Sequence, residues 1–222
     1  MRSGRDVAAG ARTRTSHDVP VRQIRAHFEG TTVRVYQAFP LDIANKATTA
    51  QTFKPPFKRE RMTWIKPSFT WMMYRSGWGS KPGQERVLGI DITRTGFDWA
   101  LAHSCITHFD AALHDSPDVW QQILRAAPVR VQWDPERTLL LEALPWRTIQ
   151  IGLRGEAVDA YLDEWIKGIE DVTVLAKEVE AAVGQNNLER AGRLVPIERP
   201  YPLSDDIARH VGCSVELTER PP

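Results

Sequence analysis

The stretch that decides the fold runs from Arg61 to Pro82 and reads RMTWIKPSFTWMMYRSGWGSKP. Residues 62–66 alternate in polarity and are rich in β-branched and aromatic side chains, which predicts a strand that ends at the following proline. Ser68 is suited to cap a helix, because the apolar residues of 69–76 recur at helical spacing. Gly77 supplies a helix stop. The stretch therefore predicts one strand that leads directly into one helix.

The junction between this strand and this helix is a candidate anion site. Free peptide N–H groups at a helix N-terminus attract negative charge. Lys66 stands just before the predicted helix and Arg75 lies within it. The alternative is that the aromatic residues of the stretch belong to the core and that its cations form a solvated face.

Length and composition indicate an ordinary globular chain. Its 222 residues are enough to bury one sizeable core, and 42% hydrophobic with 26% charged residues is a typical balance. The net charge of +1 gives no general attraction to nucleic acid or to a membrane, so any basic surface must be local. Cys105 and Cys213 are far apart and predict no disulfide framework. Because no apolar run approaches the roughly 20 residues of a membrane helix, we expect a cytoplasmic protein with no membrane partner.

The domain organisation follows from the same composition. Residues 1–19 are rich in Arg, Gly and Ala, and we expect them to be a disordered N-terminal extension. Residues 20–203 are expected to form a single domain. Residues 204–222 are expected to form a C-terminal helix and tail.

Periodicity along the chain predicts an α+β fold. Strands are expected at residues 31–37, 62–66, 85–93, 128–134 and 146–153. Helices are expected at residues 42–52, 69–76, 97–105, 119–126, 157–169, 172–183 and 204–210. Because the strands alternate in polarity instead of being apolar throughout, we expect a mixed, largely antiparallel sheet with flanking helices and a helical C-terminal part.

Few constellations in the sequence point to chemistry. His103, Cys105 and His108 form an H-x-C-x-x-H pattern that matches no standard zinc motif, so no metal is expected. Asp134 and Glu136, in an expected turn at residues 134–137, are candidate acids for a small-molecule hydrolase, although carboxylates in turns are more often solvated.

Gln150 lies in the middle of the last expected strand, on the same face as Thr148. A polar side chain on this face would line a cleft or face solvent.

Long runs of the sequence resemble an uncharacterised family of microbial and fungal proteins known only as a domain of unknown function. These runs are RVYQA at 34–38, WIKPSF at 64–69, WMMYRSGW at 71–78, KPGQERVL at 81–88 and RTIQIGL at 147–153. The resemblance covers residues 22 to about 203. It implies a family without implying a reaction.

More distantly, the order of these elements is similar to the ADP-ribosyltransferase superfamily, which implies NAD as the substrate. The resemblance implies catalytic roles for Gln150 and for Arg34 or Tyr36. It implies that the residues that bind the dinucleotide are Trp64, Lys66, Ser68, Tyr74 and Arg75, with Tyr74 stacked on nicotinamide and Lys66, Ser68 and Arg75 on the pyrophosphate. Cleavage of the nicotinamide–ribose bond develops an oxocarbenium ion, which preorganised dipoles stabilise. A glutamine at 150 can position a ribose hydroxyl but cannot act as a base, which leaves a nucleic-acid base or a small molecule open as the acceptor.

The leading hypothesis is therefore an NAD-dependent enzyme that resembles ADP-ribosyltransferases. The alternative is a non-catalytic nucleic-acid-binding module with a platform of cations and aromatic rings. The platform residues would be Arg59, Arg61, Trp64, Lys66, Trp71, Tyr74, Arg75, Trp78 and Lys81.

Overall fold

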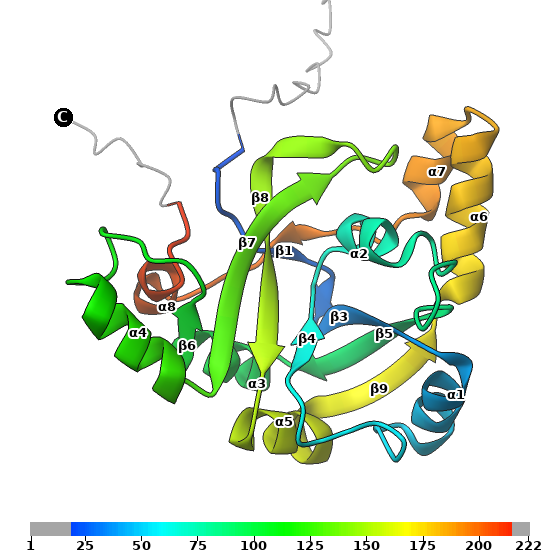
Figure 1. Cartoon of the computed structure of the whole chain (residues 1–222). Coiled ribbons are helices and arrows are strands. Elements are labelled where there is room, and N and C mark those ends of the chain that lie inside the picture. The colour runs from blue at the N-terminus through cyan, green and yellow to red at the C-terminus, as the bar shows by residue number, and fades with distance from the viewer. Residues whose placement is uncertain (1–18, 215–222) are drawn as a thin grey trace, which may run out of the picture.

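The computed structural model describes residues 19–214, which form two four-stranded sheets with flanking helices (Figure 1). The first sheet has the order β2-β3-β5-β9 and the second has the order β4-β8-β7-β6. Their strands are β2 Phe28–Glu29, β3 Thr32–Phe39, β5 Arg86–Thr93, β9 Ile166–Asp171, β4 Thr63–Ile65, β8 Ala143–Leu153, β7 Val129–Arg137 and β6 Ser104–Ile106. A separate antiparallel pair joins β1 (Arg25–Ala26) to β10 (Arg199–Pro200). Only β6 and β7 pair in parallel among these strands, which confirms the α+β class with a largely antiparallel arrangement.

The helices lie around these sheets and between their ends. They are α1 Leu41–Ala50, α2 Phe69–Ser76, α3 Arg94–Ala102, α4 Pro117–Ala126, α5 Glu156–Ala160, the π-helical turn η1 Tyr161–Trp165, α6 Thr173–Gly184, α7 Leu188–Leu194 and α8 Asp205–His210. In Figure 1, α6 and α7 stand on one side of the molecule, and α4 and α8 stand on the other. Helix α2 lies between β4 and α6.

Within residues 19–214, an isolated β-bridge between β3 and the end of β4 links the two sheets. The Tyr36 N–H donates to the Lys66 carbonyl at 2.7 Å, and the Lys66 N–H donates to the Tyr36 carbonyl at 3.3 Å. Beyond this bridge, β3 pairs with β5 and β4 pairs with β8. Helix α2 begins at Phe69, so the strand-to-helix junction is located where the sheets meet.

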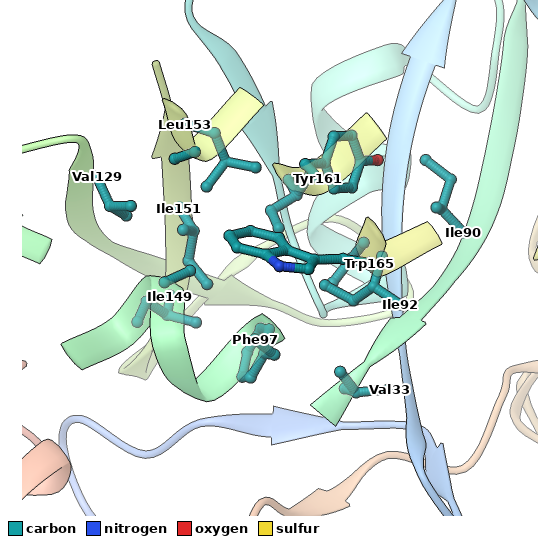
Figure 2. Close-up of a cluster of buried hydrophobic side chains, with 14 of the residues drawn as sticks. Val33, Ile90, Ile92, Phe97, Val129, Ile149, Ile151, Leu153, Tyr161 and Trp165 are labelled. Carbon is teal, nitrogen blue, oxygen red and sulfur yellow. The ribbon is translucent and has the colours of Figure 1, made fainter. Parts of the chain in front are cut away.

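The main core fills the space between the sheets (Figure 2). Trp165 from η1 lies at its centre, with Phe97 from α3 beside it. The sheets contribute alternate apolar residues, which are Val33, Val35, Leu88, Ile90 and Ile92 from the first and Ile65, Val129, Val131, Ile149, Ile151 and Leu153 from the second. The period of two in these strands follows directly from the pleat of the backbone.

A second, smaller core covers the opposite face of the first sheet. It is formed by α2, α6 and α7 together with Tyr36 and Val87, and its residues include Phe69, Trp71, Met72, Met73, Trp78, Val172, Ala176, Val179 and Ala182. Most of the aromatic rings in the 61–82 stretch are therefore core residues.

The predicted strand and helix of the 61–82 stretch are confirmed. The Ser68 hydroxyl accepts a hydrogen bond from the Trp71 N–H, as an N-cap does. Gly77 ends α2 with a φ of 58°, in the left-handed region that favours glycine.

Three local predictions are wrong, and two of them concern residues 97–105 and 134–137. The helix expected at 97–105 begins earlier, after Thr93, and ends at Ala102, so Cys105 lies in β6, where it pairs in parallel with β7. The turn expected at 134–137 is instead a continuation of β7, with a register irregularity at Pro135 that keeps the strand paired. Both cases show tertiary pairing overriding local preference.

The helix expected at 157–169 is also interrupted. It ends in η1, and residues 166–171 form β9, which pairs with β5. Gly168 and the β-branched Ile166 and Ile169 favour helix only weakly, so pairing with the open edge of β5 decides their conformation.

The C-terminal helix is present as α8, with Ser204 as its cap. Val211, just after it, is buried in the main core. The predictions for the N-terminal extension and for the end of the tail lie at residues 1–18 and 215–222, outside the described residues. No helix within residues 19–214 is long and apolar enough to cross a membrane.

Candidate functional site: the polar face of the second sheet

The face of the second sheet that points away from the main core carries polar side chains from three strands. Gln132 pairs with Gln150, and Asp134 pairs with Thr148, across β7 and β8. Lys66 follows Ile65, the last paired residue of β4. Side chains alternate along a strand, so these residues share one face. We call this set the polar face; its members are Trp64, Lys66, Arg130, Gln132, Asp134, Thr148 and Gln150.

A buried ion pair lies at the centre of the polar face. The Lys66 side chain is 1% exposed, and its Nζ donates to Asp134 Oδ2 at 2.9 Å. Nζ also lies 3.5 Å from the centroid of the Trp71 ring. Asp134 Oδ1 accepts a hydrogen bond from Gln132 Nε2 at 2.9 Å. Each charge is therefore held by at least two partners.

Burial lowers the pKa of Lys66 to about 8, although the neighbouring Asp134 carboxylate acts in the opposite direction. Perturbed ionisable groups of this kind cluster at functional sites.

Two further carboxylates surround the start of α2. Glu136 Oε1 accepts from the Ser68 hydroxyl at 2.8 Å and from the Thr70 hydroxyl at 3.3 Å. Glu198 Oε1 accepts from the Phe69 N–H at 2.7 Å. The helix N-terminus that we expected to bind an external anion is thus occupied by carboxylates of the protein itself.

Burial raises the pKa of Glu198 well above its usual value, and the nearby Glu136 adds to the effect. An acid with a raised pKa in the folded state stabilises the fold below its unfolded pKa, and this stabilisation is lost as pH rises through the folded pKa. We therefore expect Glu198→Gln, whose amide oxygen can still accept from the Phe69 N–H, to match the wild type near pH 4. At pH 7 to 8 the variant should be more stable.

Urea unfolding of both proteins across this pH range measures the difference. A difference between the two free energies of unfolding that stays constant across this pH range would contradict a raised pKa of Glu198.

Four buried side-chain polar atoms have no hydrogen-bond partner among the described residues, and two of them, in Thr148 and Arg130, belong to the polar face. They are Thr148 Oγ1, Arg130 Nε, Arg137 Nε and the Tyr36 hydroxyl. Thr148 is 2% exposed and stands opposite Asp134. Buried polar groups are nearly always paired, so an unpaired one requires an explanation.

The structure brings together some of the predicted site residues. Lys66, Trp64 and Gln150 share the polar face, and Ser68 lies at its edge, where α2 begins. The Trp64 ring packs on Gly152, where a Cβ atom would lie 2.9 Å from the indole.

The other predicted residues lie apart from the polar face or are engaged elsewhere. Arg34 forms two hydrogen bonds to Asp91 at 2.9 and 2.7 Å and a third to Glu170 at 2.7 Å. Tyr36 packs edge-on against Phe69 in the second core.

The two exposed residues of α2, Tyr74 and Arg75, are on its solvent side. Tyr74 is 40% exposed and is covered by the Arg137 guanidinium 3.6 Å from its ring centroid. Arg75 is exposed and contributes its carbonyl to Lys81.

The sequence also contained a signal for Gln132, which was not predicted as a site residue, and for the place of Asp134 in the sheet, where a turn was expected. Polar and apolar residues alternate through 128–134 in the same phase as through 146–153, which places Gln132 and Asp134 beside Gln150 once the strands pair. Glu198 had no such signal, because it lies in an irregular proline-rich segment.

The histidine and cysteine residues of the H-x-C-x-x-H pattern lie away from the polar face. Cys105 Sγ is 4.0 Å from His114 Nε2, and burial raises the pKa of this thiol. Within residues 19–214, no group of three His, Cys, Asp or Glu side chains is arranged to hold a metal ion. Of five cavities within residues 19–214, none is lined by residues of the polar face.

Fold and site together define an α+β protein whose two sheets meet at a buried lysine and whose outer polar face holds an ion pair. The chain belongs to the family described as Domain of unknown function (DUF4291), whose model matches residues 23–201. This match confirms the resemblance carried by the long sequence runs. No curated protein matches the chain.

Proposed function

We propose that the chain is an NAD-dependent enzyme of the ADP-ribosyltransferase type and that its reaction takes place on the polar face. One observation supports this assignment most strongly. The buried Lys66–Asp134 pair shares the polar face with Gln150, to which the resemblance gives a catalytic role. This arrangement presents a carboxylate, held by Lys66 and Gln132, on the same face as the Gln150 amide.

The chemistry of glycosyl transfer needs these groups. The bond between ribose C1 and the nicotinamide nitrogen breaks, nicotinamide leaves with the electron pair, and the ribose becomes an oxocarbenium ion. Asp134 would stabilise this positive charge, which Gln150 alone cannot do. Gln150 would position a ribose hydroxyl. The acceptor forms the new bond to C1 and loses its proton, for which Asp134 is the nearest carboxylate on the face.

Lys66 has a supporting role in this scheme. Its ammonium holds one carboxylate oxygen of Asp134 in place, and Gln132 fixes the other. Lys66 is a positioning residue, because its own Nζ is buried beneath Trp71 and not directed to solvent.

The nucleic-acid alternative has less support from the geometry. Lys66 is 1% exposed, and Trp71 and Trp78 are each 7% exposed. Bases cannot stack on rings that are buried in a core. Of the platform's aromatic residues, Tyr74 alone is exposed, and Arg137 already covers it.

Release of nicotinamide from NAD tests the proposal. We expect Gln150→Ala to lower the rate of nicotinamide release about 100-fold, because the loss of one positioned polar group at a reacting centre typically has this effect. Gln122→Ala, an exposed glutamine of α4, serves as the matched control and should leave the rate unchanged. Thermal melts of both variants show whether they remain folded.

Two outcomes count against the proposal. A folded Gln150→Ala variant with wild-type nicotinamide release would remove Gln150 from the site. Nucleic-acid binding that weakens steeply with salt, without any nicotinamide release, would favour the binding module instead.

A further inference from the structure

A cavity on the other side of β7 and β8 carries two arginine side chains. Its volume is about 300 Å³, at the lower end of the range for small-molecule sites. Arg22, Arg147 and Asp110 form its polar part, and Ile106, Phe109 and Trp133 form its apolar part. Trp133 and Arg147 belong to the alternate residues that point away from the polar face, so this cavity is a separate site.

Main-chain pairing places the two arginine residues side by side. Arg22 and Arg147 form a parallel bridge, and the Arg147 N–H donates to the Val21 carbonyl at 2.7 Å. Ser214 pairs with the main chain of Arg22. Its hydroxyl accepts from the Arg22 N–H, and its N–H donates to the Arg22 carbonyl. Like charges on directly opposed strand residues destabilise each other. An anion bound between the two guanidinium groups would relieve this repulsion.

Each of these arginine side chains makes one hydrogen bond to another residue within 19–214. Arg22 Nη1 donates to Asp110 Oδ2 at 3.1 Å, and Arg147 Nη1 donates to the Trp133 carbonyl at 3.0 Å. Each guanidinium has five N–H donors. No other side-chain hydrogen bond is formed by either group within residues 19–214.

The charge balance of the cavity is positive. Hydrogen bonds from the Ala112 N–H and from Arg22 hold the pKa of Asp110 below its usual value, so this carboxylate stays ionised at neutral pH. It balances one of the two guanidinium charges. The His108 ring also lines the cavity and adds a further donor or acceptor.

The geometry points to a binding site for a small molecule that carries an oxyanion, phosphate or carboxylate, on an aromatic body. Paired guanidinium groups match the oxygen spacing of phosphates and carboxylates. The Phe109 ring is 38% exposed and forms a wall on which a planar group can pack. The site is independent of the polar face and of the reaction proposed there.

Titration with three probes tests the site. Phenyl phosphate, benzoate and inorganic phosphate are added at millimolar concentrations to the full chain, and the amide signals of Phe109 and Asp110 are followed by NMR. We expect phenyl phosphate or benzoate to shift these signals. The probe that binds more tightly shows whether the site prefers a phosphate or a carboxylate. Inorganic phosphate should bind more weakly, because it lacks the aromatic body.

Three variants make the test specific. Arg147→Gln should weaken binding of the tighter aromatic probe tenfold or more, which corresponds to the loss of a charge-assisted hydrogen bond. The exposed Arg190→Gln of α7 removes the same charge elsewhere and should bind like the wild type. Phe109→Ala should weaken the aromatic probes and spare inorganic phosphate.

The assignment is overturned if none of the probes shifts the Phe109 and Asp110 amides. It is equally overturned if a folded Arg147→Gln variant binds the aromatic probes as the wild type does. Because Arg147 is exposed and lies outside the core, this variant is expected to fold.

Discussion

Lys66→Ala is expected to destabilise the chain by about 3–5 kcal/mol, the cost of removing one partner from a buried ion pair. The substitution leaves the Asp134 carboxylate, whose side chain is 15% exposed, without its countercharge. It also removes the ammonium from the Trp71 ring and opens space where α2 begins. The free energy of unfolding from urea titration measures the loss.

A surface pair in the same chain provides the matched control. Lys177 and Glu180 also form an ion pair at 2.9 Å, but their side chains are 45% and 42% exposed. Lys177→Ala should therefore cost at most about 1 kcal/mol. Equal losses for the two lysine variants would mean that burial of Lys66 contributes nothing.

The double variant Lys66→Met with Asp134→Asn tests whether the two charged side chains interact directly. Each single change leaves one buried charge unpaired, whereas the double change removes both charges. We expect the double variant to be more stable than the sum of the two single losses predicts. Strict additivity would contradict a direct interaction between Lys66 and Asp134.

Trp165→Ala is expected to cost about 3–5 kcal/mol, because the ring is 6% exposed at the centre of the main core (Figure 2). The same ring lies against the backbone of α3 at Gly96. A Cβ atom at Gly96 would overlap the Trp165 indole at its rigid end, close to the main chain. Gly96→Ala should therefore destabilise the wild type by about 1–3 kcal/mol.

The two substitutions are expected to compensate each other. With Trp165→Ala the overlap is absent, and alanine is the better helix former by roughly 1 kcal/mol. Gly96→Ala should then be neutral or stabilising in that background. A loss of the same size in both backgrounds would show that the indole does not exclude a side chain at Gly96.

Much of the fold could be predicted from local sequence. The strand at 62–66, its capping serine and the glycine stop of α2 depend on neighbouring residues, and such signals are readable without a partner. β9 could not be predicted in this way. Its residues follow a helical pattern, and only the free edge of β5, distant in sequence, makes them a strand.

The site was predictable to a smaller extent. Lys66 and Gln150 were predicted as site residues, and they do lie on one face of the sheet. They share this face because of the register of β4, β8 and β7, which the sequence of one strand does not specify. The expected anion site at α2 failed for a related reason. Glu198, 129 residues after Phe69, reaches back to the helix N-terminus.

The position of bound NAD is the most direct test of the reaction proposed for the polar face. Crystals of the chain soaked with NAD should show the nicotinamide ribose on this face, with a hydroxyl within hydrogen-bond distance of the Gln150 side chain and with C1 near Asp134. Density for the dinucleotide at another surface, such as the arginine cavity, with the polar face unchanged would contradict the account.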